Sequence, residues 1–243
     1  NMVSFEDAAQ VLYNEGFGLS FSLNSVDDYE KTIEMIMNHI NGMFFVDPYT
    51  GKFTIKLLRN DYSSDLESLL LLDESNSEVL SFQRPNYSEI INEVTLNYRP
   101  LGSSKDENVT VQNIAAIQNQ GSVVSQSVNF PAIPNSVLAA KVANRELRQR
   151  STPLAKLKIK VNRDAWNSTI GDVVRLNWNA LGIELLVFRI LSIDYGNLED
   201  GTISIEAVED IFGLSVSSYY ENQPSGWVDE ASDPQPLANY RVV

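Results

Sequence analysis

The sequence contains no cysteine and only one histidine, His39. Without cysteine there is no disulfide, no thiolate metal site and no cysteine nucleophile. A single histidine excludes a histidine-pair metal site, and a serine nucleophile would have to use His39 as its base. No G-x-S-x-G turn is present to hold such a serine. We therefore predict that His39 is solvent-facing or structurally satisfied, and that the chain binds no metal or cofactor.

Basic residues are also scarce, with 18 lysines and arginines against 32 aspartates and glutamates, which gives a formal net charge of −14. This excess of negative charge opposes binding to the phosphate backbone of nucleic acids and to anionic membrane surfaces. No run approaches the roughly 18 consecutive apolar residues that a membrane-spanning helix needs. The first ten residues lack the basic and apolar regions of a signal peptide. These absences predict an untargeted, soluble chain without stable nucleic-acid or membrane binding.

The motifs that hold phosphate groups, G-x-G-x-x-G and G-x-x-x-x-G-K-[ST], are absent. The acidic loops do not follow the D-x-[DN]-x-[DN]-G calcium pattern either. A looser calcium site is an alternative, with ligands among Asp65, Glu67, Asp73 and Glu74. We favour the interpretation that these carboxylates belong to an acidic, serine-rich loop and only contact solvent.

The clearest pattern lies between residues 154 and 213, where four apolar runs are separated by turn residues. In the first run, apolar residues alternate with Lys156, Lys158 and Lys160, which is the period of two that a half-buried strand requires. Glycines separate the runs, and the pair Asp200-Gly201 is a strong hairpin signal. The pattern predicts an antiparallel meander that forms one wall of a small barrel or sandwich, with a cationic outer face.

A helix is predicted at residues 26–41, because Ser25 and first-turn carboxylates suit a helix start and apolar residues then recur at helical spacing. The turn residues at 47–51 predict a hairpin directly after this helix. Residues 59–84 are expected to be loop around a short apolar run at 69–72. These elements together predict a helix-plus-hairpin unit.

Strands are predicted at residues 92–98 and 123–130, and we expect both to add to the barrel. A helix at about 136–149 carries a narrow apolar stripe and ends in arginines that suit its dipole. We expect this helix to pack across the barrel or to close one end of it. After residue 213, prolines and the lack of a periodic apolar pattern predict a linker or arm.

The predicted fold is therefore α+β and mainly β. It is an antiparallel β-barrel domain with a helical insertion, preceded by a small helix-plus-β-hairpin α+β domain. The expected boundaries are residues 1–85 for the helix-plus-hairpin domain, 86–213 for the barrel domain and 214–243 for a proline-containing linker or arm. A chain of 243 residues is long enough to bury a core without disulfides or metals.

Pairs of carboxylates raise the question of glycosidic-bond hydrolysis, which uses two such groups across a cleft. The candidates are Glu206 with Glu209 and Asp210, or Asp194 with Glu199. Glu206 falls on the solvent face of its predicted strand, and we interpret Glu209 and Asp210 as charge at the end of that strand. We therefore predict no catalytic residues and no enzymatic activity.

Five aromatic residues are candidates for partner contacts. Trp166 and Trp178 belong to or flank predicted barrel strands, where burial is the favoured role and contact with a partner is the alternative. Tyr219, Tyr220 and Trp227 lie in the predicted arm. Trp227 is placed to anchor that arm to a neighbouring surface, and an exposed aromatic platform there would favour binding to a surface glycan.

Several stretches, in order along the chain, resemble the central region of a known protein family. They are FVDPYTGKFTIKLLRNDY, LLLLDESN, SFQRPNYSEIINEVTLNY, NVTVQNIAAIQNQGSVVSQSVNFPAIP, STPLAKLKIKVNRDAWNSTIGDVVRLNW and IDYGNLEDGTISIEAVEDIFG, followed by PSGWV. The family is that of phage tail-tip or baseplate hub proteins, which are related to gene-transfer-agent hubs and more distantly to the lambda tip protein. The resemblance covers roughly residues 25–230.

The resemblance implies a structural virion protein, of which this chain is a central fragment. It implies a homotrimeric hub at the tail tip that joins the tail tube to a distal fibre or spike and is assembled in the bacterial host cytoplasm. Its partners would be its own copies, the tail tube and other tail-tip proteins. DNA would pass through the ring without binding stably if negative charge lines the passage. A tail-associated cell-wall hydrolase with a carboxylate pair and a surface-glycan adhesion module stay open as alternatives.

Overall fold

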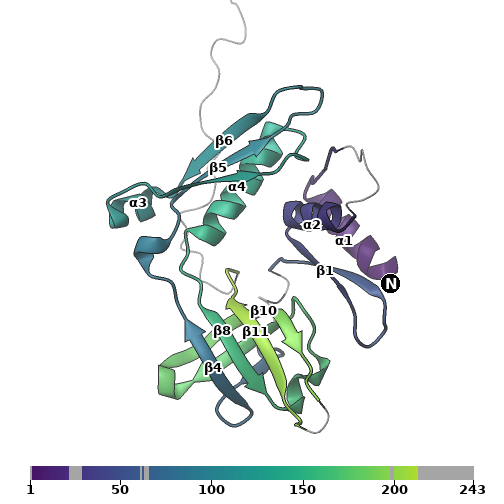
Figure 1. Ribbon diagram of the computed structural model, residues 1–243, viewed down its shortest axis with the longest axis vertical. Coiled ribbons are helices and arrows are strands. Elements are labelled where there is room, and N and C mark those ends of the chain that lie inside the picture. Colours follow the sequence, from purple (N-terminus) through teal and green to yellow (C-terminus); the bar gives the residue numbers. More distant parts are fainter. Residues whose placement is uncertain (1, 22–28, 61, 63–65, 198–199, 213–243) are drawn as a thin grey trace, which may run out of the picture. The chain divides into compact units, whose positions relative to one another are not determined.

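Figure 1 shows the computed structural model of the chain. The structure describes residues 2–21, 29–60, 62, 66–197 and 200–212. All of them belong to one compact unit. This unit contains three sheets, of two, six and three strands.

The N-terminal elements are two helices followed by a hairpin, and the predicted helix before the hairpin and the hairpin itself are confirmed. The hairpin turn forms because Asp47 Oδ1 accepts a hydrogen bond from the Tyr49 N–H at 3.0 Å, and because Gly51 adopts a positive φ of 64°. Residues 26–28 of the predicted helix lie outside the described residues. The elements are α1 (Met2–Asn14), α2 (Tyr29–Ile40), β1 (Gly42–Val46) and β2 (Phe53–Leu57).

The largest sheet has six strands in the order β3-β9-β10-β11-β8-β4. All neighbouring strands are antiparallel except β3 and β9, which are parallel. The predicted meander is confirmed for the last three strands, while β8 lies beyond β11 and beside β4. The strands are β3 (Leu70–Leu72), β4 (Ser77–Gln83), β8 (Lys156–Val161), β9 (Val173–Trp178), β10 (Ile183–Asp194) and β11 (Ile203–Glu209).

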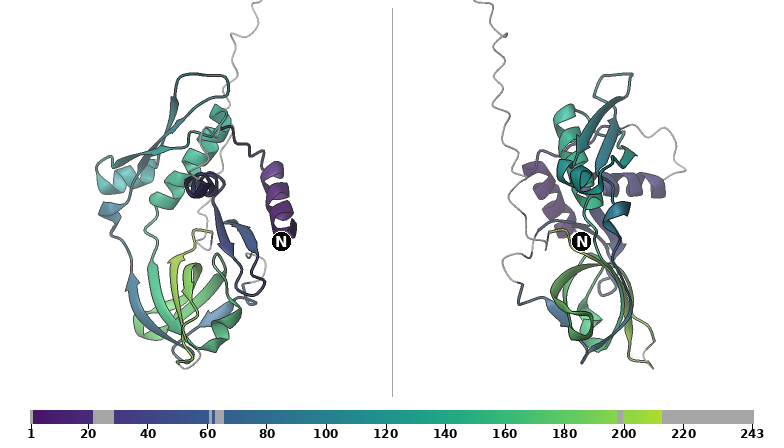
Figure 2. Two further views of the ribbon diagram at one scale, coloured as in Figure 1. Left: turned by 45° about the vertical axis from the view of Figure 1, so that its right-hand side comes forward. Right: turned by 90° about the vertical axis from the view of Figure 1, so that its left-hand side faces the viewer.

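The six-stranded sheet curls into a half-barrel (Figures 1 and 2). Its first and last strands, β3 and β4, are joined by only four residues, Asp73 to Asn76. Asn76 Nδ2 also donates a hydrogen bond to the Leu71 carbonyl at 2.8 Å. Because so short a connection cannot span a flat six-stranded sheet, the two edges must approach each other. The predicted β-barrel-like, mainly β fold is confirmed.

The core of the half-barrel is aliphatic, with a single large aromatic side chain. Along β8 buried apolar residues alternate with exposed lysines, which confirms the predicted alternation, although glutamates of β4 and β11 lie opposite two of these lysines. Each fully buried Leu, Ile or Phe side chain stabilises the fold by about 1.5–3 kcal/mol relative to exposure. The largest fully buried side chains of this core are Phe188, Leu72, Ile159, Leu176, Ile190, Ile203 and Ile205.

The segment between β4 and β8 forms a second layer with its own core. α4 packs on β5 and β6, and its start is capped by Asn135 Oδ1, which accepts from the Leu138 N–H at 2.9 Å. The helix predicted at 136–149 is thus confirmed. The elements are a 3₁₀ turn (Tyr87–Glu89), β5 (Glu93–Tyr98), β6 (Glu107–Gln112), α3 (Ile114–Gln120), β7 (Ser125–Asn129) and α4 (Ser136–Arg150).

Two expectations about this second layer are wrong. The strands predicted at 92–98 and 123–130 do not join the barrel, because β5, β6 and β7 form a separate three-stranded sheet. The helix does not pack across the barrel, because its apolar residues, among them Leu138 and Val142, form a core with Leu96 and Tyr98 of β5. Alternation shows that a strand has an apolar face, but it does not show which sheet the strand joins.

Residues 59–84, expected to be loop around a short apolar run at 69–72, contain two strands: β3 coincides with that run, and β4 was not predicted. In β4 a register shift between Val79 and Ser81 places the apolar residues Val79 and Phe82 three positions apart. That spacing hides the period of two by which a strand is recognised. The expected boundary at residue 85 consequently cuts the half-barrel, because β3 and β4 pair with β9 and β8 on its other side.

Candidate assembly surfaces

The three-stranded sheet presents one face to α4 and the opposite face, here called the open face, away from it. Side chains alternate along each strand, so the strand pairing assigns nine residues to the open face. All nine are polar, only one is charged, and none is buried. They are Glu93, Thr95 and Asn97 of β5, Asn108, Thr110 and Gln112 of β6, and Ser125, Ser127 and Asn129 of β7.

Cross-strand hydrogen bonds connect the open face. Thr95 Oγ1 and Thr110 Oγ1 lie 2.9 Å apart, and Asn97 Nδ2 donates to Asn129 Oδ1 at 2.9 Å. Hydrogen bonds from the side chains of Gln112 and Ser125 lower the pKa of Glu93. The carboxylate therefore stays ionised, and several donors and acceptors of the face are already engaged with one another.

The outer face of the half-barrel has a different composition. Lys158 forms an exposed ion pair with Glu206, with Nζ and Oε1 2.7 Å apart, and Lys160 stands opposite Glu78 in the strand pairing. Mixed charges of this kind are usual on a solvated strand. The open face carries neither lysine nor arginine, and the low charge distinguishes it within the same molecule.

His39 connects α2 to the loop that follows β7. Its ring is only 2% exposed, with Nδ1 2.7 Å from the Met35 carbonyl and Nε2 accepting from the Ala132 N–H at 3.2 Å. These partners require a neutral ring with the proton on Nδ1. Burial lowers the pKa of His39, which favours the same neutral form. His39 was predicted to face solvent or to be buried with its hydrogen bonds satisfied, and the second role is the correct one.

Arg145 of α4 binds the end of α2. Its Nη1 donates to the His39 carbonyl at 2.8 Å, and its Nη2 donates to the Asn38 carbonyl at 3.1 Å and lies 3.0 Å from Glu146 Oε1. The last carbonyls of a helix have no partner inside the helix, so an arginine there satisfies them and suits the helix dipole. The helix-plus-hairpin elements are thereby fixed to the layer that carries the open face.

The same hairpin is also tied to the half-barrel. Lys56 of β2 forms an ion pair with Asp172, which precedes β9. The side chains of Lys56 and Met43 also lie against Gly171. Arg189 of β10 donates from Nη2 to the Arg59 carbonyl at 3.0 Å. Ionic and backbone contacts therefore couple all three sheets.

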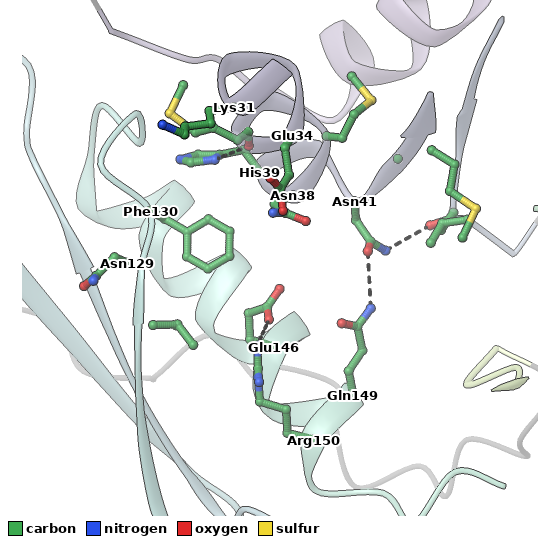
Figure 3. A pocket seen from close by; sticks show the side chains of 16 residues that line it. Lys31, Glu34, Asn38, His39, Asn41, Asn129, Phe130, Glu146, Gln149 and Arg150 are labelled. Atoms are coloured by element: carbon green, nitrogen blue, oxygen red, sulfur yellow. Dashed lines mark hydrogen bonds and ion pairs between the residues drawn. The ribbon is translucent and has the colours of Figure 1, made fainter. Parts of the chain in front are cut away.

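A pocket of about 710 Å³ lies between α2, α4 and the end of β7 (Figure 3). Three of the four methionines of the chain line it, and unbranched methionine side chains adapt readily to different neighbours. Glu146 in its wall is bound to Arg150, with Oε2 and Nη2 3.0 Å apart. Val128, Asn129 and Phe130, at the end of β7 and directly after it, also line the pocket.

The two tryptophans named as candidates for partner contacts lie in different environments. Trp178 ends β9 and is half-buried against the barrel core. Trp166, in a 3₁₀ turn (Arg163–Asn167), is 56% exposed, so the favoured prediction of burial is wrong for it. Its ring meets that of Tyr49 edge to face, with centroids 5.7 Å apart. Tyr219, Tyr220 and Trp227 lie outside the described residues.

Three of the carboxylates considered for hydrolysis, Glu206, Glu209 and Asp210, lie in different environments. Glu206 lies on the solvent face, as predicted, and is paired with Lys158. The prediction of strand-end, solvated charge is wrong for Glu209 and Asp210, which are 2% and 4% exposed. Glu209 Oε2 accepts from the Ala155 N–H at 2.9 Å and lies 2.8 Å from Arg84 Nη2.

Of the remaining candidate carboxylates, Asp194 and Asp73 accept hydrogen bonds within their own turns, whereas Glu74 binds a residue far away in the chain. Asp194 Oδ1 accepts from the Gly196 N–H at 3.0 Å, and Glu199 lies outside the described residues. Asp73 accepts from the Ser75 N–H at 2.8 Å, and Glu74 Oε1 accepts from the Ala180 N–H at 3.3 Å. Asp65 lies outside the described part of the chain, within which no three His, Asp or Glu side chains gather in the manner of a metal site. Within the same part, no helix is long and apolar enough to cross a membrane.

Comparison with known families decides the membership of the chain. The model of the family described as "Putative phage tail protein" matches residues 29–193, which is more than half of the chain. The chain belongs to this phage tail protein family. As a phage tail protein it is a structural component of the virion, and the resemblance stated from the sequence is confirmed at this level.

Two solved structures share the fold of the tail protein. One is the virion of a native gene transfer agent particle, with a TM-score of 0.60 and 16% identity, where the match covers 83% of this chain and 46% of that chain. The other is the tail protein from Neisseria meningitidis MC58, with a TM-score of 0.55 and 18% identity, covering 79% and 59%. The tail protein thus spans less than two thirds of either relative. No curated protein matches its sequence.

Sequence reasoning missed the open face of the tail protein, although its signal is present. The strand prediction at residues 92–98 left the polar residues of β5 uninterpreted. In β5, β6 and β7 the residues of the open face are Thr, Ser, Asn, Gln and one Glu, without Lys or Arg. Three neighbouring strands with the same composition are a usable sign of a shared, weakly charged surface.

Proposed function

We propose that the tail protein is the hub at the distal tip of the phage tail. Copies of the chain form a homotrimeric ring that joins the tail tube to a distal fibre or spike. Its partners are its own copies, the tube and other tail-tip proteins, and assembly takes place in the cytoplasm of the bacterial host. DNA passes through the ring without binding stably.

The observation that carries this proposal is the composition of the open face. A passage for DNA must stay hydrated and must not hold phosphate groups, which lysine and arginine would do. All nine residues of the open face are polar, and one of them is a carboxylate while none is a cation. The net charge of −14 adds a repulsive background for a polyanion at short range. A sheet with these properties suits the wall of such a passage.

The contacts between the three sheets support a mechanical role. A hub has to transmit force between tube and fibre without changing shape, so its layers must be fixed to one another. Arg145 joins α4 to α2, Lys56 joins the hairpin to the half-barrel, and Arg189 joins β10 to the chain after β2. Glu209 and Asp210, which a hydrolase would need free, are bound to arginines. These features favour a non-enzymatic component.

Immunogold electron microscopy of intact particles tests the position in the tail. Antibodies against the purified chain are expected to label the end of the tail that is distant from the head. Antibody absorbed beforehand with the purified chain is the control and should leave particles unlabelled. Label along the tube, or at the junction of tail and head, would contradict the proposal.

A second candidate function, adhesion to a surface glycan, is favoured by the exposed pair of Trp166 and Tyr49. Exposed aromatic rings supply contact area for a partner and are frequent at binding hot spots. Titration of the chain with host surface polysaccharide, followed by tryptophan fluorescence, separates this function from the hub. Adhesion predicts a saturable change that Trp166→Phe diminishes. A flat titration would exclude it while leaving the hub intact.

A further inference from the structure

Asn92 is fully buried and holds together several chain segments at one end of the three-stranded sheet. Its Nδ2 donates to the Ser122 carbonyl at 2.8 Å, and its Oδ1 accepts from the Val124 N–H at 2.8 Å. Nδ2 also donates to Gln120, whose own Nε2 donates to the Tyr87 carbonyl. The 3₁₀ turn before β5, α3 and the turn after α3 are therefore fixed to one another.

Three apolar side chains on these segments are exposed, and we call them the α3 surface. They are Tyr87 of the 3₁₀ turn, Ile114 at the first position of α3 and Val123 in the turn after α3, each more than half exposed. Single exposed apolar residues are usual on a protein, whereas a group of them is typical of a contact site. The α3 surface lies at the end of the sheet, apart from α4 (Figure 1).

α3 lacks the packing that normally stabilises a helix. It has seven residues, Ile114–Gln120, and within the described part of the chain none of them is buried. Helices this short are marginal in water, and those in proteins depend mainly on burial of an apolar face. α3 is held by its caps instead: Asn113 Oδ1 accepts from the Ala116 N–H at 3.1 Å, and Gly121 follows with a positive φ of 73°. Its apolar residues are thus available to a partner.

The sequence around α3 carries no charge. Charged residues make up 21% of the chain, yet none occurs from Asn108 to Ala140. Part of this stretch supplies β6 and β7 to the open face, but α3 and the turn after it lie outside that face. Of the three segments, only the 3₁₀ turn of Tyr87 carries a charge, at Glu89. The core of a protein–protein interface is depleted in charged residues in the same way.

The low charge points to a second copy of this chain as the occupant. The chain has a net charge of −14, so two copies repel each other. Like charges that face each other across an interface are costly, and copies are therefore opposed least where the contact surface is uncharged. A basic partner would instead bind best to carboxylates, of which these segments hold only Glu89.

We infer that the α3 surface lies in the contact between neighbouring copies of the chain in the ring. This inference rests on the proposed hub ring and specifies one side of its contact. In a closed ring each copy meets the next head to tail, so the α3 surface packs on a different surface of the neighbour. The contact does not use the open faces, which stay free to line the passage.

Photocrosslinking in intact particles tests the inference. The photoreactive residue p-benzoylphenylalanine replaces Ile114 in the full-length tail protein, and irradiated particles are analysed by denaturing gel electrophoresis and mass spectrometry. We expect dimers and trimers of the chain, in which position 114 is joined to a peptide of the same protein from outside α3. Crosslinks to a different tail protein, or no crosslinks, would overturn the inference.

The matched control carries the same photoreactive residue in place of Leu181. Leu181 is also an exposed apolar residue of a short helical turn, Asn179–Leu181, but it belongs to the half-barrel. Its turn lies beside a charge, because the Ala180 N–H donates to Glu74 Oε1 at 3.3 Å. We expect few crosslinks between copies from position 181. Equal crosslinking between copies from both positions would show an unspecific reaction and would contradict the inference.

A second pair of variants tests whether assembly needs the contact. Ile114→Asp places a carboxylate in the first turn of α3, where the helix dipole favours it, so the chain itself should stay folded. In the ring this carboxylate would be buried without a partner, and we expect assembled particles to fall by about tenfold or more. Leu181→Asp should assemble normally, and urea unfolding checks that both purified chains are folded. Normal assembly of a folded Ile114→Asp protein would refute the contact.

The crosslinks also separate failure of this inference from failure of the hub proposal. Dimers joined only from position 114 to position 114 would place the α3 surface between copies and contradict a head-to-tail ring. Crosslinks from position 114 to another tail protein would overturn the inference, while immunogold label at the tail tip would still support the hub.

Discussion

Arg189 and Asp210 form a buried ion pair in which Arg189 Nη2 lies 2.7 Å and Nε 3.0 Å from Asp210 Oδ2. Both side chains are 4% exposed. The same guanidinium donates from Nη1 to the Gly171 carbonyl and from Nη2 to the Arg59 carbonyl, each at 3.0 Å. One arginine therefore holds together the end of β11, the turn before β9 and the chain after β2.

Loss of the Asp210 carboxylate should strongly destabilise the fold. In Asp210→Ala the arginine stays buried without its counter-charge, and breaking a buried pair in this way costs about 3–5 kcal/mol. Asp194→Ala removes an exposed aspartate that accepts only a turn hydrogen bond, so it should cost less than about 1 kcal/mol. Urea denaturation measures both. Similar losses in the two variants would show that the ion pair does not stabilise the junction.

Two glutamates on β11 should also differ in how much they stabilise the fold, with the buried one contributing more. Glu209 is buried and bound to the Ala155 N–H and to Arg84, whereas Glu206 forms an exposed pair with Lys158. Glu209→Ala is expected to lower the free energy of unfolding by about 3 kcal/mol, since it leaves buried partners unsatisfied. Glu206→Ala should lower it by less than about 1 kcal/mol. Thermal and urea unfolding provide the measurement, and a larger effect of Glu206 would refute the assignment.

Acid should weaken the contact at His39. The pKa of His39 is lowered in the folded chain, so the unfolded chain binds a proton more readily. The stability due to neutral His39 is therefore complete above the unfolded value of about 6.5 and is lost as the pH falls from there toward the lower folded pKa. Wild-type chain should lose more unfolding free energy between pH of about 7.5 and 5.5 than His39→Gln. Equal losses would contradict the buried, neutral ring.

Two glycines with similar backbones should respond differently to alanine. Gly196 and Gly182 have φ of 60° and 64°, a region that costs an L-residue about 1–2 kcal/mol. A Cβ at Gly196 would lie 2.5 Å from the Thr202 carbonyl oxygen, while one at Gly182 meets nothing within 4 Å. Gly196→Ala should therefore destabilise the chain more than Gly182→Ala in the same urea titration. Equal losses of unfolding free energy in the two variants would mean that the β10–β11 connection shifts to accommodate the added methyl group.

The sequence predicts those elements of the fold whose signals are local. The lysines of β8 at every second position, the turn at residues 47–51 and the helix with its stripe at 138 and 142 each depend on residues close in the chain. The pairing of β4 with β8 does not, because more than seventy residues separate the two strands and a bulge disturbs the pattern of β4. Long-range pairing is decided by packing, which periodicity alone does not encode.

The candidate surfaces were predicted less well than the fold. Composition identified acidic residues but could not place Glu209 and Asp210 beside Arg84 and Arg189, since these partners come from other parts of the chain. Trp166 was expected to be buried because it flanks a strand, yet it lies in a 3₁₀ turn at the surface. The open face became visible only when three strands from different parts of the chain were aligned.

An electron cryomicroscopy reconstruction of the tail tip tests the central claim most directly. The account predicts a three-fold ring in which Thr95, Thr110 and Ser127 face the central passage. A reconstruction in which another protein covers the open face, or in which that face points to the outside of the tail, would contradict it.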